Sequence, residues 1–436
     1  MSKRMRETRA ASAGVPHPER EAVLAGGGEV ERQRRFDRVY FVGSLFRGYA
    51  LVEAARAVDD AEPRADGLPG GLRFPEIVAG TEATSLIELA ETDRRRRGSR
   101  GVSEQLFVLD REFLGADAAG IAAEVRERLP GAAVLLMVAE TEGRISTVQV
   151  EERDRVDLVG VWGGSLESLA SLIWLVQDER SAVHDLGRGI PALVLVEDEP
   201  ALYSMFLPMI YNELLIRTRE LVPAGVPEES FWRFLDHRPR ILLAETYEQG
   251  LLILGRYSPY LIGVIADLQF PVGSEVQPDA GLWLGGVVRV LRPTLPLIIH
   301  SNAKQPPAGI DDLAAFYLSK SSEDWLLELR RVMLDFYGFG DFVFRDSHGV
   351  EIRRAHDVRS LRDQLALIPL ESFVFHGRRN HLSTWLYIHG AHELARRLRP
   401  LQGDDEGTRA KAVTMMDEYL RATAHTPPTL QGEVSW

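Results

Sequence analysis

The chain has 436 residues, a formal net charge of −13 and 45% hydrophobic residues. A single hydrophobic core rarely exceeds roughly 250–300 residues, so we expect more than one domain. The acidic balance argues against a nucleic-acid surface, which needs clustered cations, and the lack of cysteine excludes disulfides and thiolate metal sites. No apolar run approaches the roughly 18 residues of a membrane span, and no apolar signal core opens the sequence. We therefore expect a cytoplasmic protein with no membrane partner.

The first part of the chain predicts an arm followed by an α/β unit. Residues 1–35 mix Arg, Glu, Gly and Pro without an apolar period, which is typical of a flexible arm. The four arginines at 94–97 lie between a predicted helix and the next strand, where we expect a solvated loop. Within a unit at 36–188, apolar runs predict strands at 39–42, 77–78, 106–109, 133–138 and 156–161, and a closing helix at 165–177.

A second unit at 189–338 repeats the order of elements of the first. The long stretch between Asp198 and Asp267 predicts an extended or additional helix within 208–238. Short buried-type strands separated by helices indicate a parallel sheet with helices on both faces. We therefore expect two tandem, doubly wound, flavodoxin-like parallel sheets of five strands each. The apolar runs that place strands of the second sheet are 193–196, 261–266, 295–299 and 316–319.

The remaining chain predicts a small, mostly helical domain at 339–400, then a helix and tail at 401–436. A turn at 347–349 joins two short strands into a hairpin. A polar cluster follows, for which two interpretations stay open: a structural helix start, or a contact for a small anion or a partner. Its members are His376, Arg378, Arg379, Asn380 and His381.

Polar residues follow the apolar runs of the second unit where each run ends. Glu197 and Asp198 follow the first run, and Asp267 ends the next. Ser301 and Lys320 follow the last two runs. Because chemistry in parallel sheets gathers at the carboxyl ends of the strands, we expect these side chains to share one crevice.

These residue types suit transfer of a phosphoryl group to a carboxylate. The attack joins two anions, so a divalent cation must bridge them, and oxygen ligands suit Mg²⁺. We expect Asp198, Asp267 and the backbone carbonyl of Gln269 to bind the ion, and Glu197 to bind it through a water or orient one. Asp267 is then the nucleophile and phosphoacceptor.

Two further residues contribute to the same chemistry. Lys320 offers a positive charge to one phosphoryl oxygen, and the hydroxyl of Ser301 donates to another. An ionised aspartate is already a nucleophile, so the site needs no separate general base.

The order acid pair, Asp, Ser and Lys resembles bacterial response-regulator receiver domains. The segment Asp267-Leu268-Gln269-Phe270-Pro271 matches their phosphoacceptor loop, and Gly281 matches the glycine that opens the next helix. The resemblance implies that Tyr317 is the aromatic switch whose rotamer follows phosphorylation. The chain departs from the pattern by an insertion at 272–280 and by Ser321, where many receivers have proline.

The first unit resembles a disabled copy of the second, a pseudo-receiver that serves as a platform for binding or dimerisation. Asp110 occupies the acceptor position, but Gly43 and Ser44 stand where the acid pair is expected. Ala139 replaces the hydroxyl residue and Trp162 replaces the lysine. Without these helpers, we expect no phosphorylation at Asp110.

Residues 38–400 also resemble the tandem receiver-like region of certain bacterial proteins. Those proteins continue into a phosphoenolpyruvate/pyruvate-binding domain of the pyruvate phosphate dikinase type. No such domain is recognised after residue 400, so dikinase activity is not expected of this chain. The matching segments are Val161-Trp162-Gly163-Gly164, 173–178, His184-Asp185, 195–198, 203–208, 338–344, 376–381 and Trp385-Leu386.

Three functions follow as hypotheses. The first is a two-component response regulator that accepts phosphate on Asp267 from a sensor histidine kinase or phosphotransfer protein. It would act through an output protein or a homodimer rather than DNA, and would have no enzymatic activity beyond its own phosphorylation and dephosphorylation. The second is a phosphorylation-independent scaffold or regulatory subunit for a partner such as a dikinase. The third, a haloacid-type hydrolase, needs an aspartate where Gln269 stands, and ranks last.

Overall fold

The computed structural model describes residues 36–44, 47–48, 50–52, 75–97, 104–141, 144–145, 150–162, 165–220, 238–401 and 405–424. The predicted arm at 1–35, the tail beyond 424 and the stretch 221–237 lie outside the described residues. None of the helices within the described ranges combines the length and the apolar character needed to cross a membrane.

The first sheet has five parallel strands in the order β2-β1-β3-β4-β6. A short strand β5 pairs antiparallel with the end of β4. Helices α4 and α6 cover one face, where their apolar residues pack with those of β1, β3 and β4. The strands are β1 Phe36–Val42, β2 Glu76–Gly80, β3 Glu104–Asp110, β4 Ala133–Thr141, β5 Arg144–Ile145 and β6 Leu158–Trp162. The helices are α4 Ala83–Arg97, α5 Arg111–Leu114, η2 Gly115–Asp117, α6 Ala118–Arg128, α7 Val150–Arg153 and α8 Leu166–Gly187.

The second sheet repeats this order as β8-β7-β9-β12-β13, again parallel. Helices α11 and α12 pack on one face, and α9 and α13 on the other. The strands are β7 Ala192–Val196, β8 Arg240–Ala244, β9 Leu261–Asp267, β12 Leu297–Ser301 and β13 Phe316–Ser319. The helices are α9 Pro200–Glu220, α11 Tyr247–Tyr257, η3 Ser258–Tyr260, α12 Ala280–Leu291, η4 Asp311–Leu313 and α13 Trp325–Asp335. The expected α/β class with two five-stranded parallel sheets is confirmed, and both strand orders match the flavodoxin-like arrangement.

Two local predictions are wrong. The arginines at 94–97 belong to α4 and not to a loop; buried Asp93 accepts hydrogen bonds from Tyr40 and Arg38 and so fixes this end of the helix to β1. Helix α8 runs on to Gly187, well past the expected end at 177. A helix does occupy the first part of the stretch 208–238, although α9 begins earlier, at Pro200; the strand β8, which begins at Arg240, was not predicted.

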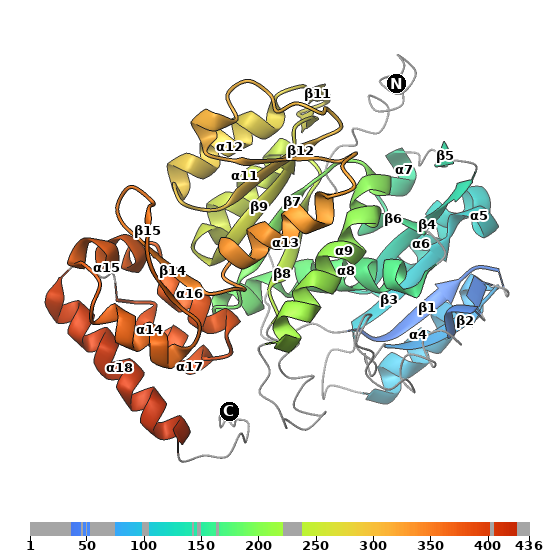
Figure 1. Ribbon diagram of the computed structural model, residues 1–436. Helices are drawn as coiled ribbons and strands as arrows, with labels where there is room; N and C mark the ends of the chain where they lie inside the picture. Colours follow the sequence, from blue (N-terminus) through green and yellow to red (C-terminus); the bar gives the residue numbers. More distant parts are fainter. Residues whose placement is uncertain are drawn as a thin grey trace.

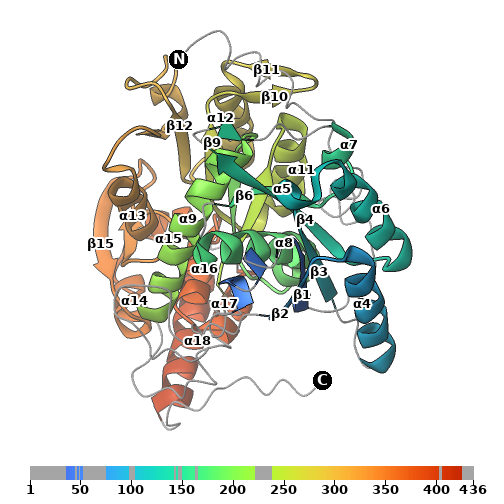
Figure 2. The same cartoon turned by 90° about the vertical axis from the view of Figure 1, so that its right-hand side faces the viewer.

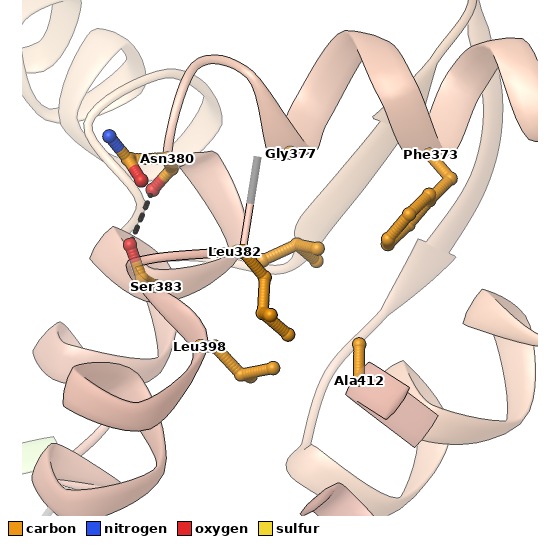
Figure 3. Close-up of a pocket in the computed structure, with 8 residues that line it drawn as sticks. Phe373, Gly377, Asn380, Leu382, Ser383, Leu398 and Ala412 are labelled. Atoms are coloured by element: carbon orange, nitrogen blue, oxygen red, sulfur yellow. Dashed lines mark hydrogen bonds between the residues drawn. The ribbon is translucent and has the colours of Figure 1, made fainter. Parts of the chain in front are cut away.

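The last described part of the chain is a hairpin followed by five helices. Their apolar residues form a core of their own, joined by Ile190. A small, mainly apolar pocket in this core includes Leu382, Leu398 and Ala412 in its lining, and the hydroxyl of Ser383 donates to the carbonyl of Asn380 at its rim (Figure 3). The elements are β14 Phe342–Arg345, β15 Glu351–Ala355, α14 Val358–Leu365, α15 Leu370–Gly377, α16 His381–Ile388, α17 His392–Leu398 and α18 Glu406–Ala424.

Helices α8 and α9 lie side by side between the two sheets and seal one edge of each (Figures 1 and 2). The edge strand β6 of the first sheet bonds to α9: the amide of Val161 donates to the hydroxyl of Ser204, and the hydroxyl of Tyr203 donates to the carbonyl of Val159. An open strand edge leaves its outward N–H and C=O groups unpaired, so these side chains complete the ladder.

The edge strand β8 of the second sheet is sealed by α8 in the same way. The amide of Ile241 donates to Asp178 at 2.9 Å, and the amide of Leu243 donates to Glu179 at 3.3 Å. The last helix of the first unit thus covers the second sheet, while the first helix of the second unit covers the first sheet. One hydrophobic cluster accordingly contains residues of both sheets.

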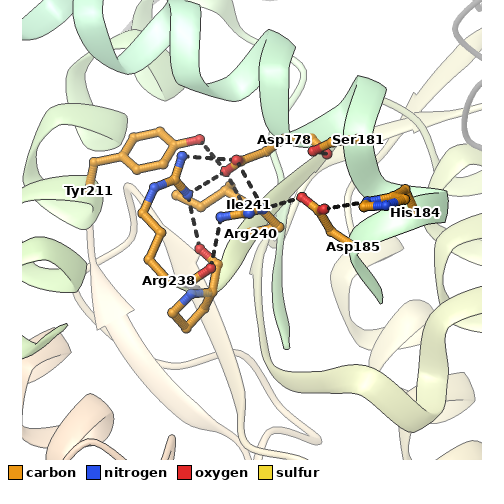
Figure 4. Close-up of polar contacts among 9 residues, drawn as sticks. Asp178, Ser181, His184, Asp185, Tyr211, Arg238, Arg240 and Ile241 are labelled. Atoms are coloured by element: carbon orange, nitrogen blue, oxygen red, sulfur yellow. Dashed lines mark hydrogen bonds and ion pairs between the residues drawn. The ribbon is translucent and has the colours of Figure 1, made fainter. Parts of the chain in front are cut away.

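Asp178 is the centre of a buried polar network on this helix (Figure 4). Both of its carboxylate oxygens accept from the guanidinium of Arg238, at 2.8 and 2.9 Å, and one also accepts from the hydroxyl of Tyr211. Arg240 donates to Asp185 at 2.7 Å, and His184 bonds to the other oxygen of Asp185. Burial raises the pKa of the Tyr211 hydroxyl, and the neighbouring Asp178 charge raises it further.

This network predicts a large loss of stability on removal of its central charge. We expect Asp178→Ala to lower the free energy of unfolding by about 3–5 kcal/mol, because Arg238 keeps a buried, unpaired charge. Chemical denaturation of the full chain measures the change. Glu418→Ala removes an exposed ion pair with Arg397 and serves as the control, with little expected effect. Equal effects of the two substitutions would contradict the role assigned to Asp178.

Candidate functional site

The polar strand-end residues of the second sheet meet at one edge. Glu197 and Asp198 follow β7, Asp267 ends β9, Ser301 ends β12 and Lys320 follows β13. These four strands are neighbours in the sheet, and all run in the same direction. The three acids are at most 4% exposed, and the Lys320 side chain is 1% exposed.

The three carboxylates form a compact acidic cluster. Each of Glu197, Asp198 and Asp267 offers an oxygen that lies within 4.8 Å of the others. The amine of Lys320 lies 2.5 Å from Oε2 of Glu197 and 2.9 Å from Oδ2 of Asp267. Three carboxylates beside one ammonium carry an excess of negative charge when ionised, which a divalent cation with oxygen ligands would neutralise. The donor set therefore fits a metal such as Mg²⁺.

The pKa shifts of Glu197 and Lys320 reflect the same excess of acidic groups over cations. Burial raises the pKa of Glu197 well above its usual range, and the adjacent Asp267 charge adds to this rise while Lys320 opposes it. Burial works against the charge of Lys320, but its two acidic partners raise the pKa of its ammonium above the usual value. Lys320 therefore remains charged, and the acids share a single cation.

The loop after Asp267 is held close to the start of α12. The amide of Gly281 donates to the carbonyl of Leu268, and a Cβ atom at position 281 would lie 2.3 Å from the carbonyl oxygen of Asp267. Only glycine allows this approach. Gln269 is half-buried in the turn between β9 and β10 (Phe270–Val272). The insertion predicted at 272–280 begins within an antiparallel hairpin that β10 forms with β11 (Glu275–Gln277).

Ser301 and Tyr317 contact the same short loop. The hydroxyl of Ser301 accepts from the amide of Ala303 at 3.3 Å, and the hydroxyl of Tyr317 donates to the carbonyl of Ala303 at 2.5 Å. The amide of Lys320 donates to the carbonyl of Ser301 at 2.8 Å. The loop after β12 is thus tied to both the hydroxyl residue and the partly exposed tyrosine.

His300 belongs to this site and was not predicted. Its ring is fully buried against Phe206, with Nε2 at 3.7 Å from Oε2 of Glu197. Burial lowers the pKa of His300 well below its usual range, and the Lys320 charge lowers it further, so the ring is neutral. The available signal was its place directly before Ser301, in a strand of otherwise apolar residues.

The corresponding edge of the first sheet has the same backbone but different side chains. The amide of Gly43 donates to Gly80 after β1, as the amide of Glu197 donates to Ala244 after β7. Asp110 ends β3 as Asp267 ends β9. A Cβ atom at position 43 would lie 2.6 Å from Cβ of Asp110, so this edge has no room for an acid at that position.

Arg47 neutralises the acid of the first sheet, a role that the sequence did not reveal. Its guanidinium lies 2.6 Å from Oδ1 of Asp110 and 5.5 Å from the ring centre of Trp162. Strand register places Trp162 at the position of Lys320, as expected, but Val138 rather than Ala139 at the position of Ser301. The first sheet still lacks a hydroxyl at this position, because neither Val138 nor Ala139 carries one.

The two histidines of the C-terminal cluster form a chain of hydrogen bonds at a helix start. Helix α16 begins at His381, as the structural interpretation expected; the anion interpretation stays open. The amide of Arg345 donates to Nε2 of His376, so neutral His376 carries its proton on Nδ1 and donates to Nδ1 of His381 at 3.1 Å. His381 then carries its proton on Nε2 and donates to the hydroxyl of Thr294 at 3.2 Å. The chain connects the hairpin to the second unit.

In comparisons with known proteins, no family model matches the chain, and no curated protein matches it significantly.

The contact at Gly281 predicts that an added methyl group is harmful there and harmless nearby. We expect Gly281→Ala to lower the free energy of unfolding by about 1–3 kcal/mol, because the obstructing atom is a backbone oxygen. Gly286→Ala, on the same helix with nothing near its Cβ, should be neutral or stabilise by up to about 1 kcal/mol. Urea denaturation compares the two, and equal effects would refute the close approach.

The neutral histidine pair predicts a loss of stability in acid. Burial lowers the pKa of His376 to about 3 and the pKa of His381 well below its usual range, whereas both are near 6.5 when unfolded. The unfolded chain therefore binds more protons below pH 6.5, and each histidine should cost about 1.4 kcal/mol per pH unit there.

Urea denaturation between pH 7.5 and about 5.5 measures this slope. His376→Gln should reduce it, whereas His348→Gln, at an exposed position of the hairpin turn, should leave it unchanged. An unaltered slope in His376→Gln would show that the pair does not titrate as described.

Proposed function

We propose that the chain is a two-component response regulator whose second unit is a receiver that accepts a phosphoryl group on Asp267. The observation that carries the proposal is the buried cluster of Glu197, Asp198 and Asp267, paired with Lys320 at the carboxyl edge of a flavodoxin-like sheet. Its resemblance to bacterial receivers supports the same reading of these residues.

Each residue has a role in the proposed transfer. A carboxylate oxygen of Asp267 forms the bond to phosphorus while the bond between phosphorus and the donor breaks. Asp198 and Asp267 would bind Mg²⁺ with the carbonyl of Gln269, and Glu197 would orient a ligand water; the ion would reduce the repulsion between the two anions. Lys320 would leave its ion pair with Asp267 to contact a phosphoryl oxygen, and Ser301 would donate to another.

The loop after β12 offers a route from the acceptor to the surface. Ser301 and Tyr317 both bond to Ala303. A phosphoryl group that takes up the Ser301 hydroxyl would compete with the amide of Ala303 and bias this loop between two arrangements. A sensor kinase or phosphotransfer protein would supply the phosphoryl group, and an output protein would bind the altered surface.

The first unit is proposed as a pseudo-receiver with no phosphoryl chemistry. Arg47 already supplies the cation for Asp110, and Gly43 leaves no room for a metal-binding acid. Because this unit shares a core with the second, its surface would serve as a phosphate-independent platform for a partner or a second copy.

The alternative is a scaffold or regulatory subunit that never accepts phosphate. The ion pairs of Lys320 with Glu197 and Asp267 favour it, since they already stabilise the acids without a metal. The two hypotheses differ in one measurable reaction.

Incubation with acetyl phosphate and Mg²⁺, followed by intact mass measurement, tests the proposal. We expect one phosphoryl adduct in the natural chain and in Asp110→Asn, and none in Asp267→Asn or when Mg²⁺ is chelated. Lys320→Met should slow labelling by about 10²–10³-fold. No adduct under conditions that label a control receiver would favour the scaffold, and an adduct retained in Asp267→Asn would refute the assigned acceptor.

A further inference from the structure

Three arginines converge where the C-terminal helices contact the second unit. Arg292 follows α12, Arg379 lies between α15 and α16, and Arg399 follows α17. All three side chains are half-buried. We refer to Arg292, Arg379 and Arg399 as the arginine cluster.

Hydrogen bonds hold the members of the cluster close together. Arg292 donates to the carbonyl of Ser258 and, at 3.3 Å, to the carbonyl of Arg379. Arg399 donates to the carbonyl of Pro259 at 2.5 Å, and Pro259 directly follows Ser258. The guanidinium of Arg399 lies 4.4 Å from the ring centre of Tyr260. Two guanidinium groups therefore occupy adjacent positions at η3, and the third residue is bonded to one of them.

The charge of the cluster has no acidic partner. No carboxylate among the described residues lies within 4.0 Å of any of the three guanidinium groups. Burial lowers the pKa of Arg292, and the charges of Arg399 and Arg379 lower it further, as expected when like charges meet. The carbonyl end of a helix offsets only about half an elementary charge. The contact thus keeps an excess of positive charge.

Most donors of the cluster are also unused. A guanidinium has five N–H donors in a planar fork. Arg379 donates one to the carbonyl of Phe375, and its buried Nε has no acceptor. The hydroxyl of Thr294, which accepts from His381, lies two residues after Arg292 and offers a further donor nearby. Donors without a protein acceptor, one of them buried, beside uncompensated charge are conditions under which guanidinium groups bind oxyanions.

We propose that the arginine cluster binds a phosphoryl oxyanion, either free phosphate or the phosphate of a small monoester. Phosphate fits better than a carboxylate because it has two negative charges and enough oxygens to accept from three guanidinium groups. The anion would join α12 and η3 of the second unit to the C-terminal helices, and its binding would stabilise their contact. This site is separate from the acidic cluster and does not depend on the proposed phosphorylation.

Calorimetric titration of the full chain with inorganic phosphate tests the proposal. A chelator removes divalent cations, so that phosphate cannot be held by metal at the acidic cluster, and chloride at matched ionic strength sets the background. We expect saturable binding at one site, with at least tenfold weaker binding in Arg379→Gln and in Arg399→Gln. Arg399→Lys retains the charge but not the planar fork, and should fall between them and the natural chain.

Arg289→Gln is the matched control. Arg289 is also half-buried on α12, but it donates to the carbonyls of Leu295, Leu313 and Ala314 and is not part of the cluster. Its substitution should leave phosphate affinity unchanged. A parallel titration with glycerol 3-phosphate distinguishes the source: tighter binding than phosphate indicates an esterified ligand, and weaker binding indicates the free ion. No saturable binding, or equal loss in Arg289→Gln, would overturn the proposal.

Discussion

The structure depends on the sealing of two strand edges by helices that belong to opposite units. An edge strand inside a molecule must satisfy its outward backbone groups, and β8 does so through the carboxylates of α8. Asp178 is itself buried, and the guanidinium groups of Arg238 and Arg240 lie 2.8 and 3.7 Å from its carboxylate. Because β6 is sealed by α9 in return, neither unit completes its sheet without the other.

This mutual dependence explains how two sheets of one topology differ in chemistry. In both, the first and third strands end side by side and present an aspartate. In the first sheet, Arg47 and the close approach of Gly43 leave that aspartate with one fixed partner. In the second, three acids share Lys320, which leaves negative charge for a metal. The first unit, whose edge holds no such acidic cluster among the described residues, still contributes its half of the common core.

The second unit therefore carries two sites of opposite charge. Its carboxyl edge concentrates buried negative charge, whereas its contact with the C-terminal helices concentrates positive charge in the arginine cluster. Helix α12 runs between them, since it begins beside the Asp267 loop and ends at Leu291, directly before Arg292.

The sequence by itself determined the class of fold and most of the acidic site. Alternating apolar runs and helices specify parallel sheets, and a residue after each run must lie at the carboxyl edge, so Glu197, Asp198, Asp267 and Lys320 could be grouped without coordinates. Local patterns could not reveal the role of Arg47 or the convergence of the arginine cluster, because their partners are distant in the chain. His300 left one signal, its place directly before Ser301 in an otherwise apolar strand. The extension of α8 and the position of β8 were likewise decided by tertiary structure. Charged residues such as Asp178 look solvent-exposed in sequence, and only the pairing of α8 with a distant strand edge explains their burial.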